Sequence, residues 1–211
     1  METKFTEQES LAVINEMIKQ ARNNFNKGSG TGMVFYGTLV SCMAIINVIL
    51  ALLFIKTGID PNNSFWIWSL MIPSFYVGYL IEKKIERKAL VKTHLDSIIS
   101  TTWQGYIYAV YLFLAVIFCI GFGKKMFDLF YLINPGILIL IGLAEFVSAK
   151  TYRFKPYLYG AFIMWLGAVI CTALMWGPYP VIFQLLIMAL CMFLGFVIPG
   201  HKLNKLAEEN V

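Results

Sequence analysis

Residues 33–55 read MVFYGTLVSCMAIINVILALLFI, a run without a single charged side chain. The apolar core of a bilayer is about 30 Å thick, and an α-helix needs roughly 20 residues to cross it. Five further runs of this kind follow, at residues 64–81, 103–123, 129–149, 156–176 and 180–199. The sequence therefore predicts an all-α polytopic membrane protein, with a bundle of six transmembrane helices over residues 33–199.

The overall composition agrees with this interpretation. Apolar residues make up 59% of the 211 residues and charged residues 14%, and the mean hydropathy is +0.70. Soluble domains carry about 25% charged residues. An intrinsically disordered chain is excluded, because disorder needs low hydrophobicity and high charge. Four cysteines in so apolar a chain also exclude a secreted module held together by disulfides.

Lysine and arginine are distributed unevenly between the loops. If the N-terminus is cytoplasmic, the outer loops hold only Lys56, Lys124 and Lys125. The inner segments hold the other 14: Lys4, Lys19, Arg22, Lys27, Lys83, Lys84, Arg87, Lys88, Lys92, Lys150, Arg153, Lys155, Lys202 and Lys205. The positive-inside rule therefore predicts an N-in, C-in orientation. The net charge of +5 follows from this bias and requires no nucleic-acid partner.

The N-terminal segment, residues 1–32, is predicted to be cytoplasmic or interfacial. Within it, residues 6–26 form an expected amphipathic helix, because Leu11, Ile14 and Ile18 recur at three- and four-residue spacing. A glycine-rich break then precedes the first span. Such a helix either lies in the membrane interface or docks onto another protein, which includes a second copy of this chain.

The longest inner loop, residues 82–102, contains neither glycine nor proline and is predicted to be helical. The loop begins with a mixed-charge stretch in which Glu82 and Glu86 accompany Lys83, Lys84, Arg87 and Lys88. This stretch is either a solvated surface or a contact surface for a soluble partner or for lipid headgroups. The last residues, 200–211, are predicted to form a cytoplasmic tail.

Catalytic and metal-binding motifs are absent from the sequence. The two histidines, His94 and His201, fall in inner segments, and no two of the four cysteines share a span. The chain contains no HEXXH or CxxC pattern and offers no nucleophile with a matching base. We therefore expect a protein that is not an enzyme, with no catalytic residues, no metal and no cofactor.

Glu145 is the only ionisable group inside a predicted span. A carboxylate in a membrane is costly, so it is by default a candidate functional residue. One interpretation is structural, in which Glu145 extends toward the inner interface or pairs with Lys150, Arg153 or a basic residue of the second inner loop. The other is a site for a solute or a proton.

Amides and prolines are the other notable residues inside the spans. Asn47 and Gln184 either make hydrogen bonds between helices or line a polar cavity. Pro73 and Pro135 remove backbone hydrogen bonds within the second and fourth spans, which predicts kinks there.

Several stretches together resemble one family of small six-span proteins from Bacteroides-like gut bacteria. They are FTEQESLAVINEMIKQARNNF (5–25), YLIEKKIERKALVKTHLDSIIS (79–100), GLAEF (142–146), RFKPYLYGA (153–161) and GFVIPGHKLNK (195–205). The resemblance covers nearly the whole chain and implies a multi-pass protein of the bacterial inner membrane. It implies no reaction, substrate or site residue.

The predicted architecture also resembles the permease subunit of type-2 ABC exporters, in which a helical inner loop docks an ATPase. This chain is shorter than most such permeases, and the likeness is one of architecture alone.

Two functions remain open at this point. The leading hypothesis is a non-enzymatic regulatory or sensing component that lies in the bilayer and acts through a cytoplasmic partner, such as a regulatory protein or an ATPase. The alternative is a small-solute transporter or permease subunit that uses a polar site near Glu145.

Overall fold

The structure, a computed structural model, describes residues 11, 28, 30–86 and 94–209. Within these ranges the chain is helical apart from short turns, and no strand occurs. Six helical stretches are long and apolar enough to cross a membrane: Thr31–Thr57, Pro61–Ile81, His94–Gly123, Phe127–Tyr152, Lys155–Trp176 and Pro180–Ala207. The chain is therefore a multi-pass membrane protein, and the prediction of six spans is confirmed.

The described part of the chain divides into α-helices joined by short segments of other helix types. The α-helices are α2 (Thr31–Thr57), α3 (Met71–Glu86), α4 (His94–Gly123), α5 (Ile133–Tyr152), α6 (Lys155–Ala173), α7 (Pro180–Met192) and α8 (Ile198–Glu209). The 3₁₀ segments are η1 (Pro61–Leu70), η2 (Phe127–Leu132) and η3 (Leu174–Trp176), and η4 (Phe193–Val197) is π-helical.

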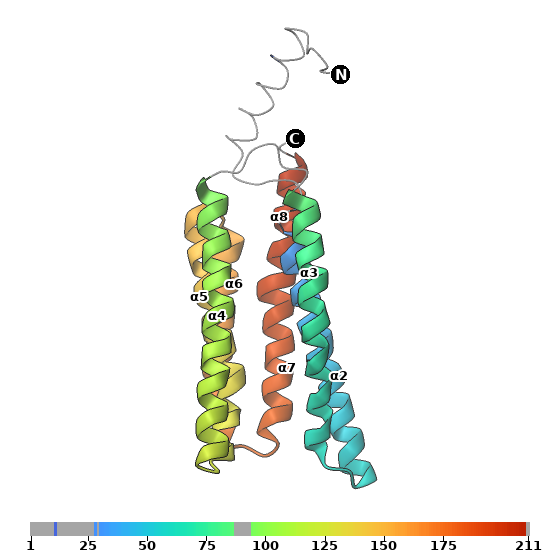
Figure 1. Ribbon diagram of the computed structural model, residues 1–211. Helices are drawn as coiled ribbons and strands as arrows, with labels where there is room; N and C mark the ends of the chain where they lie inside the picture. Colours follow the sequence, from blue (N-terminus) through green and yellow to red (C-terminus); the bar gives the residue numbers. More distant parts are fainter. Residues whose placement is uncertain (1–10, 12–27, 29, 87–93, 210–211) are drawn as a thin grey trace, which may run out of the picture.

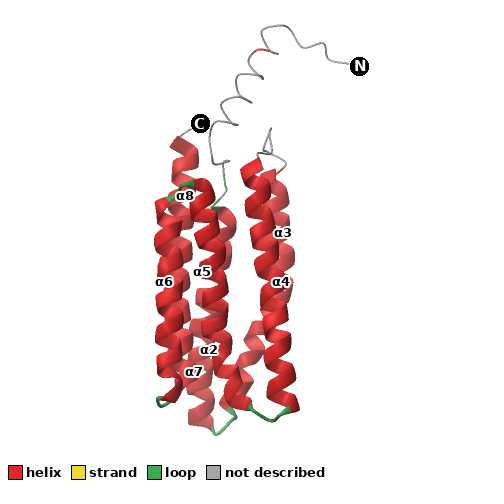
Figure 2. Ribbon diagram, turned by 90° about the vertical axis from the view of Figure 1, so that its left-hand side faces the viewer, coloured by secondary structure: helices red, strands yellow, loops and turns green. Residues whose placement is uncertain are grey.

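The helices run side by side along one axis (Figures 1 and 2). Helices α5 and α6 form a tightly packed hairpin with α4 against α5, and α2 packs on α7 with α3 at its side. Figure 1 shows α4, α5 and α6 on one side, α2 and α3 on the other, and α7 between them. Most core side chains come from α2, α5, α6 and α7, and Phe196 of η4 and Leu203 of α8 complete the core. Most apolar side chains of α3 and α4 are exposed, as expected for surfaces that face lipid.

The two ends of the bundle differ in charge. The end where α2 begins and α8 ends also carries Lys83, Lys84, Lys150 and Lys155, and we call it the basic end. At this end the Asn204 carboxamide oxygen accepts a hydrogen bond from the Gly30 backbone N–H at 2.9 Å, and its nitrogen lies 3.4 Å from the Thr31 hydroxyl. The C-terminal helix thereby holds the start of the first span.

The prolines of the second and fourth spans, where we expect kinks, lie next to a change of helix type. Both spans begin as 3₁₀ helix and change to α-helix at Met71 and Ile133, two residues before Pro73 and Pro135. Each proline therefore stands in the first α-helical turn.

The helices extend beyond the apolar runs at the basic end. The predicted loop 82–102 is helical at both ends, because α3 continues to Glu86 and α4 begins at His94; residues 87–93 lie outside the described residues. The predicted tail 200–211 is helical through Glu209. The predicted N-terminal helix lies outside the described residues except for Leu11, which is helical and exposed.

Candidate binding site at Glu145

Glu145 is completely buried in α5, two turns before that helix ends at Tyr152. Neither of its carboxylate oxygens has a hydrogen-bond partner within the described ranges 30–86 and 94–209. Buried polar groups in proteins are nearly always hydrogen-bonded, and an unpaired one calls for an explanation. Glu145 is therefore the strongest candidate for a functional residue.

The expected pairing of Glu145 with Lys150 or Arg153 is not found, and the loop residues Arg87, Lys88 and Lys92, which could also pair with it, lie outside the described residues. Lys150 is exposed, and its Nζ lies 5.4 Å from the ring centroid of Phe146. Residues five apart on an α-helix lie about 140° apart around its axis, so Lys150 points outward while Glu145 points into the bundle. Arg153 ends the helix in a left-handed conformation and is also exposed.

Two glycines form the wall that the carboxylate faces. A β-carbon at Gly160 on α6 would stand 3.1 Å from both oxygens of Glu145 and would overlap the carbonyl oxygen of Gly195. Gly195 belongs to the π-helical segment η4. π turns are rare and recur at functional sites. The carboxylate therefore lies where α6 and an irregular turn of the last span touch backbone to backbone.

Tyr157 is a further neighbour of this site. It is buried, and it lies one turn before Gly160 on α6, which places it between Glu145 and the basic end. The Tyr152 hydroxyl donates a hydrogen bond of 3.2 Å to Asp96 Oδ1 on α4.

Aromatic rings lie on the side of the site that faces α4. The ring centroid of Trp103 is 5.5 Å from that of Phe196 and 5.6 Å from that of Tyr106. Phe196 follows Gly195 directly in η4. The Trp103–Phe196 contact thereby joins α4 to the π-helical segment.

The two buried amides lie elsewhere in the bundle. The carboxamide oxygen of Asn47 accepts a 2.7 Å hydrogen bond from Ser64 in η1, while its nitrogen has no partner among the described residues. Gln184 Nε2 donates to the carbonyl oxygens of Tyr131, at 3.1 Å, and Cys171, at 3.0 Å.

Asn47, Gln184 and Glu145 therefore do not form one polar cavity. Gln184 precedes Gly195 by 11 residues on the same helical stretch, which corresponds to roughly 16 Å along the axis. Gln184 ties α7 to α6 and η2, and Asn47 ties α2 to η1. Both amides make the hydrogen bonds between helical segments that are usual for such residues in membranes.

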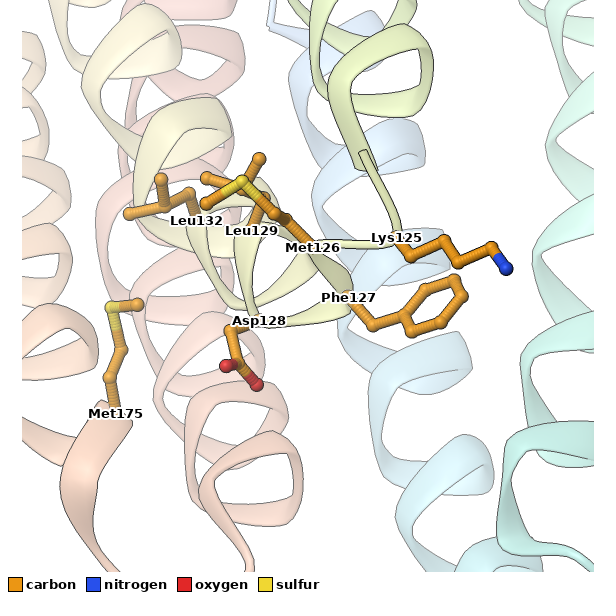
Figure 3. Close-up of a pocket in the computed structure, with 7 residues that line it drawn as sticks. All are labelled: Lys125, Met126, Phe127, Asp128, Leu129, Leu132 and Met175. Carbon is orange, nitrogen blue, oxygen red and sulfur yellow. The ribbon is translucent and has the colours of Figure 1, made fainter. Parts of the chain in front are cut away.

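A shallow pocket at the end opposite the basic end offers no second site. It has a volume of about 460 Å³ and is lined by Lys125, Met126, Phe127, Asp128, Leu129, Leu132 and Met175. Figure 3 shows the Lys125 amine and the Asp128 carboxylate pointing in different directions. The polar groups of this pocket do not converge on a common point.

Metal-binding and thiol chemistry have no evident site in the described ranges. No group of three or more His, Cys, Asp or Glu side chains is placed to hold a metal ion among the residues that the structure describes. Cys171 and Cys191 are buried, and their sulfur atoms lie near the carbonyl oxygens of Gln184 and Ile163.

The predicted docking residues are only partly described. Lys83 and Lys84 are exposed at the end of α3, with Lys83 Nζ 5.5 Å from the Tyr79 ring centroid. Leu11 is 58% exposed. The others, Ile14, Ile18, Arg87 and Lys88, lie outside the described residues.

Comparisons of this chain with protein-family models, with curated proteins and with solved structures found no match.

Proposed function

We propose that this protein is a small-solute transporter or permease subunit whose cycle loads a cation, a proton included, at Glu145. The observation that carries the proposal is the complete burial of both Glu145 oxygens without a hydrogen-bond partner in the described part of the chain. A buried ionised carboxylate without a counter-charge costs several kcal/mol. A carboxylate held in this way is suited to bind and release a positive charge.

The surroundings of Glu145 support the same role. The Gly160–Gly195 contact places backbone, rather than a competing cation, beside the carboxylate. The π-helical turn can change to α-helix by a small shift of backbone hydrogen bonds. Such a shift offers a local way to alter access to the site during a transport cycle.

We also propose that the protein lies in a bacterial inner membrane with both termini in the cytoplasm. The support is the 14-to-3 distribution of Lys and Arg, together with exposed lysines at the basic end such as Lys202 and Lys205. In this orientation Glu145 lies about 10 Å along α5 from its cytoplasmic end.

The test is charge movement in proteoliposomes adsorbed to a solid-supported electrode. Steps in proton or sodium concentration are applied to the wild type, to Glu145→Gln and to Glu209→Gln. Glu209 is exposed and lies on α8, so its variant is the matched control. We expect a transient current in the wild type and the control and its loss in Glu145→Gln. Currents that are equal in all three proteins, or absent from the wild type, would refute the proposal.

A second candidate function is a regulatory or sensing component that acts through a cytoplasmic partner, without catalysis of its own. The contact of Asn204 with Gly30 and Thr31 favours it. A partner bound to residues 6–26 would act on the start of the first span, which is hydrogen-bonded to Asn204 in the C-terminal helix. The last span includes Asn204 and also η4, which borders the Glu145 site.

Crosslinked purification from native membranes tests this second function. The full chain is compared with a variant that lacks residues 6–26. A stoichiometric soluble partner that is lost with the deletion would support regulation, and an ATPase would indicate a permease subunit. A partner that is retained by the deletion variant excludes this helix as the docking surface.

A further inference from the structure

Hydroxyl groups lead from Glu145 toward the basic end of the bundle. Tyr152 follows Glu145 by seven residues on α5, so the two side chains lie on nearly the same face of the helix, about 10 Å apart along its axis. Tyr157 lies on α6, which runs antiparallel to α5 and packs tightly against it. Gly160 and Glu145 lie at the same height along the bundle axis. Tyr157 is one turn closer to the basic end than Gly160, so its height lies between those of Glu145 and Tyr152.

The last group in this direction is an acid on a different helix. The Tyr152 hydroxyl donates to Asp96 Oδ1 at 3.2 Å, and Asp96 lies in the first turn of α4 at the basic end. Asp96 is half-buried, whereas Tyr152, Tyr157 and Glu145 are buried. The acid therefore stands between the bundle interior and the aqueous phase.

We propose that Glu145 exchanges a proton with the aqueous phase at the basic end through Tyr157, Tyr152 and Asp96. This inference rests on the proposed function, and it identifies the loaded cation as a proton and its side of entry as the cytoplasm. For entry, Asp96 takes a proton from water. The Tyr152 hydroxyl, which donates to Asp96 in the structure, and the Tyr157 hydroxyl turn toward Glu145, whose oxygens have no hydrogen-bond partner among the described residues. Asp96 then passes its proton to the Tyr152 oxygen, Tyr152 gives its own proton to Tyr157, and Tyr157 gives its own to the Glu145 carboxylate. One proton is gained by Glu145, and Tyr152 is left donating to Asp96, as in the structure.

Among the described residues, the other titratable groups that approach α5 do not offer an equivalent route. On α4, Tyr106 is half-buried beside Trp103, at the level of the site rather than on the way out. On α6, Lys155 and Tyr159 are exposed. The segment η4 contributes only Phe, Leu, Gly and Val side chains, and Cys191 on α7 lies four residues farther from the basic end than Gly195.

Ser148 is another hydroxyl in this region, and it provides a control. It is fully buried on α5, three residues after Glu145, but its hydroxyl donates to the Ala144 carbonyl oxygen at 2.8 Å. Its proton is held by the helix backbone, so we expect that Ser148 does not take part in the relay.

The experiment measures hydrogen–deuterium exchange of the Glu145 carboxylic acid by infrared spectroscopy of proteoliposomes. The carbonyl stretching band that is missing from Glu145→Gln identifies the protonated group, and its shift in D₂O gives the exchange rate. We expect Tyr157→Phe, Tyr152→Phe and Asp96→Asn to slow this exchange by about tenfold or more, equivalent to about 1.4 kcal/mol in the barrier. Ser148→Ala and Tyr159→Phe should exchange at the wild-type rate. Phenylalanine keeps the ring packing, including the edge-to-face contact of residue 157 with Phe154.

Each possible result decides between the relay and its alternatives. Equal exchange rates in the wild type and Tyr157→Phe would overturn the relay, and slowing by Ser148→Ala alone would assign the route to that serine instead. A Glu145 band that appears at no pH would also overturn it. In any of these cases, Glu145-dependent currents on sodium or proton steps would leave the proposed transport function standing. Loss of those currents would remove that function separately.

Discussion

A β-carbon at Gly195 would stand 3.2 Å from the carbonyl oxygen of Gly160 and 3.4 Å from its Cα, so these two glycines bring the backbones of η4 and α6 into contact. Small residues permit such close approach of helices in membranes. Here the approach also sets the position of the Glu145 carboxylate, which lies against Gly160.

Gly160→Ala should destabilise the protein by about 1–3 kcal/mol, because the added methyl group would overlap the Gly195 carbonyl oxygen. Reversible unfolding in detergent micelles measures the change. Gly105→Ala on α4 is the control, since no atom lies within 4 Å of the added carbon. There we expect a gain of about 0.5–1 kcal/mol from the better helix former. Equal effects of the two substitutions would mean that the Gly160–Gly195 contact is loose.

Glu145→Leu should stabilise the folded state by about 1–3 kcal/mol, because it removes a buried polar group whose hydrogen bonds are unmade. The same substitution should abolish the transient current. Glu209→Leu on the exposed face of α8 should change stability by less than about 0.5 kcal/mol. A loss of stability in Glu145→Leu would show that the carboxylate has a partner in the folded protein.

Gln184→Leu should destabilise the protein by about 1 kcal/mol, because hydrogen bonds within a membrane contribute roughly 0.6 kcal/mol each and Gln184 donates two of them. Transient currents should persist, since Gln184 lies far from Glu145. Gln104→Leu is the control, because Gln104 is exposed on α4. Loss of current in Gln184→Leu would contradict the separation of the two residues.

A double-mutant cycle between Asn47→Leu and Ser64→Ala should give a coupling energy of about 0.6 kcal/mol. The reason is their 2.7 Å hydrogen bond, which ties α2 to the 3₁₀ start of the second span. The cycle of Asn47→Leu with Ser74→Ala should give no coupling, because the Ser74 hydroxyl donates to the Met71 carbonyl instead. Coupling energies of similar size in both cycles would mean that Asn47→Leu weakens the packing of α2 as a whole and that the coupling does not report the Asn47–Ser64 hydrogen bond.

The number of helices and the all-α fold could be predicted from hydropathy, because a long apolar segment in a bilayer can satisfy its backbone hydrogen bonds as a helix. The residues at which the helices begin and end could not be predicted in this way. Helix α4 begins at His94, nine residues before its apolar run, and in this extension the partly buried Leu95 and Ile99 pack against the core. Hydropathy averages over such polar turns, although backbone hydrogen bonding continues through them.

The candidate site was only partly predictable. Glu145 was visible as the one ionisable residue within a run, but its nearness in sequence to Lys150 suggested a pairing that the 140° angle between them forbids. Gly160, Gly195 and Tyr157 were not assigned to the site from the sequence. Their roles depend on contacts between segments far apart in the chain and on a π turn that no local pattern marks.

The 3₁₀ segment η1 has a consequence for bilayer thickness. A 3₁₀ helix rises about 2.0 Å per residue and an α-helix about 1.5 Å. The ten residues of η1 therefore reach about 5 Å farther than they would as α-helix. The second span, with 21 residues, thereby gains the reach of a longer helix. Because the 3₁₀ segment shortens by the same amount on conversion to α-helix, a thinner bilayer would favour that conversion, so this end of the protein can adjust to hydrophobic mismatch without tilting the bundle.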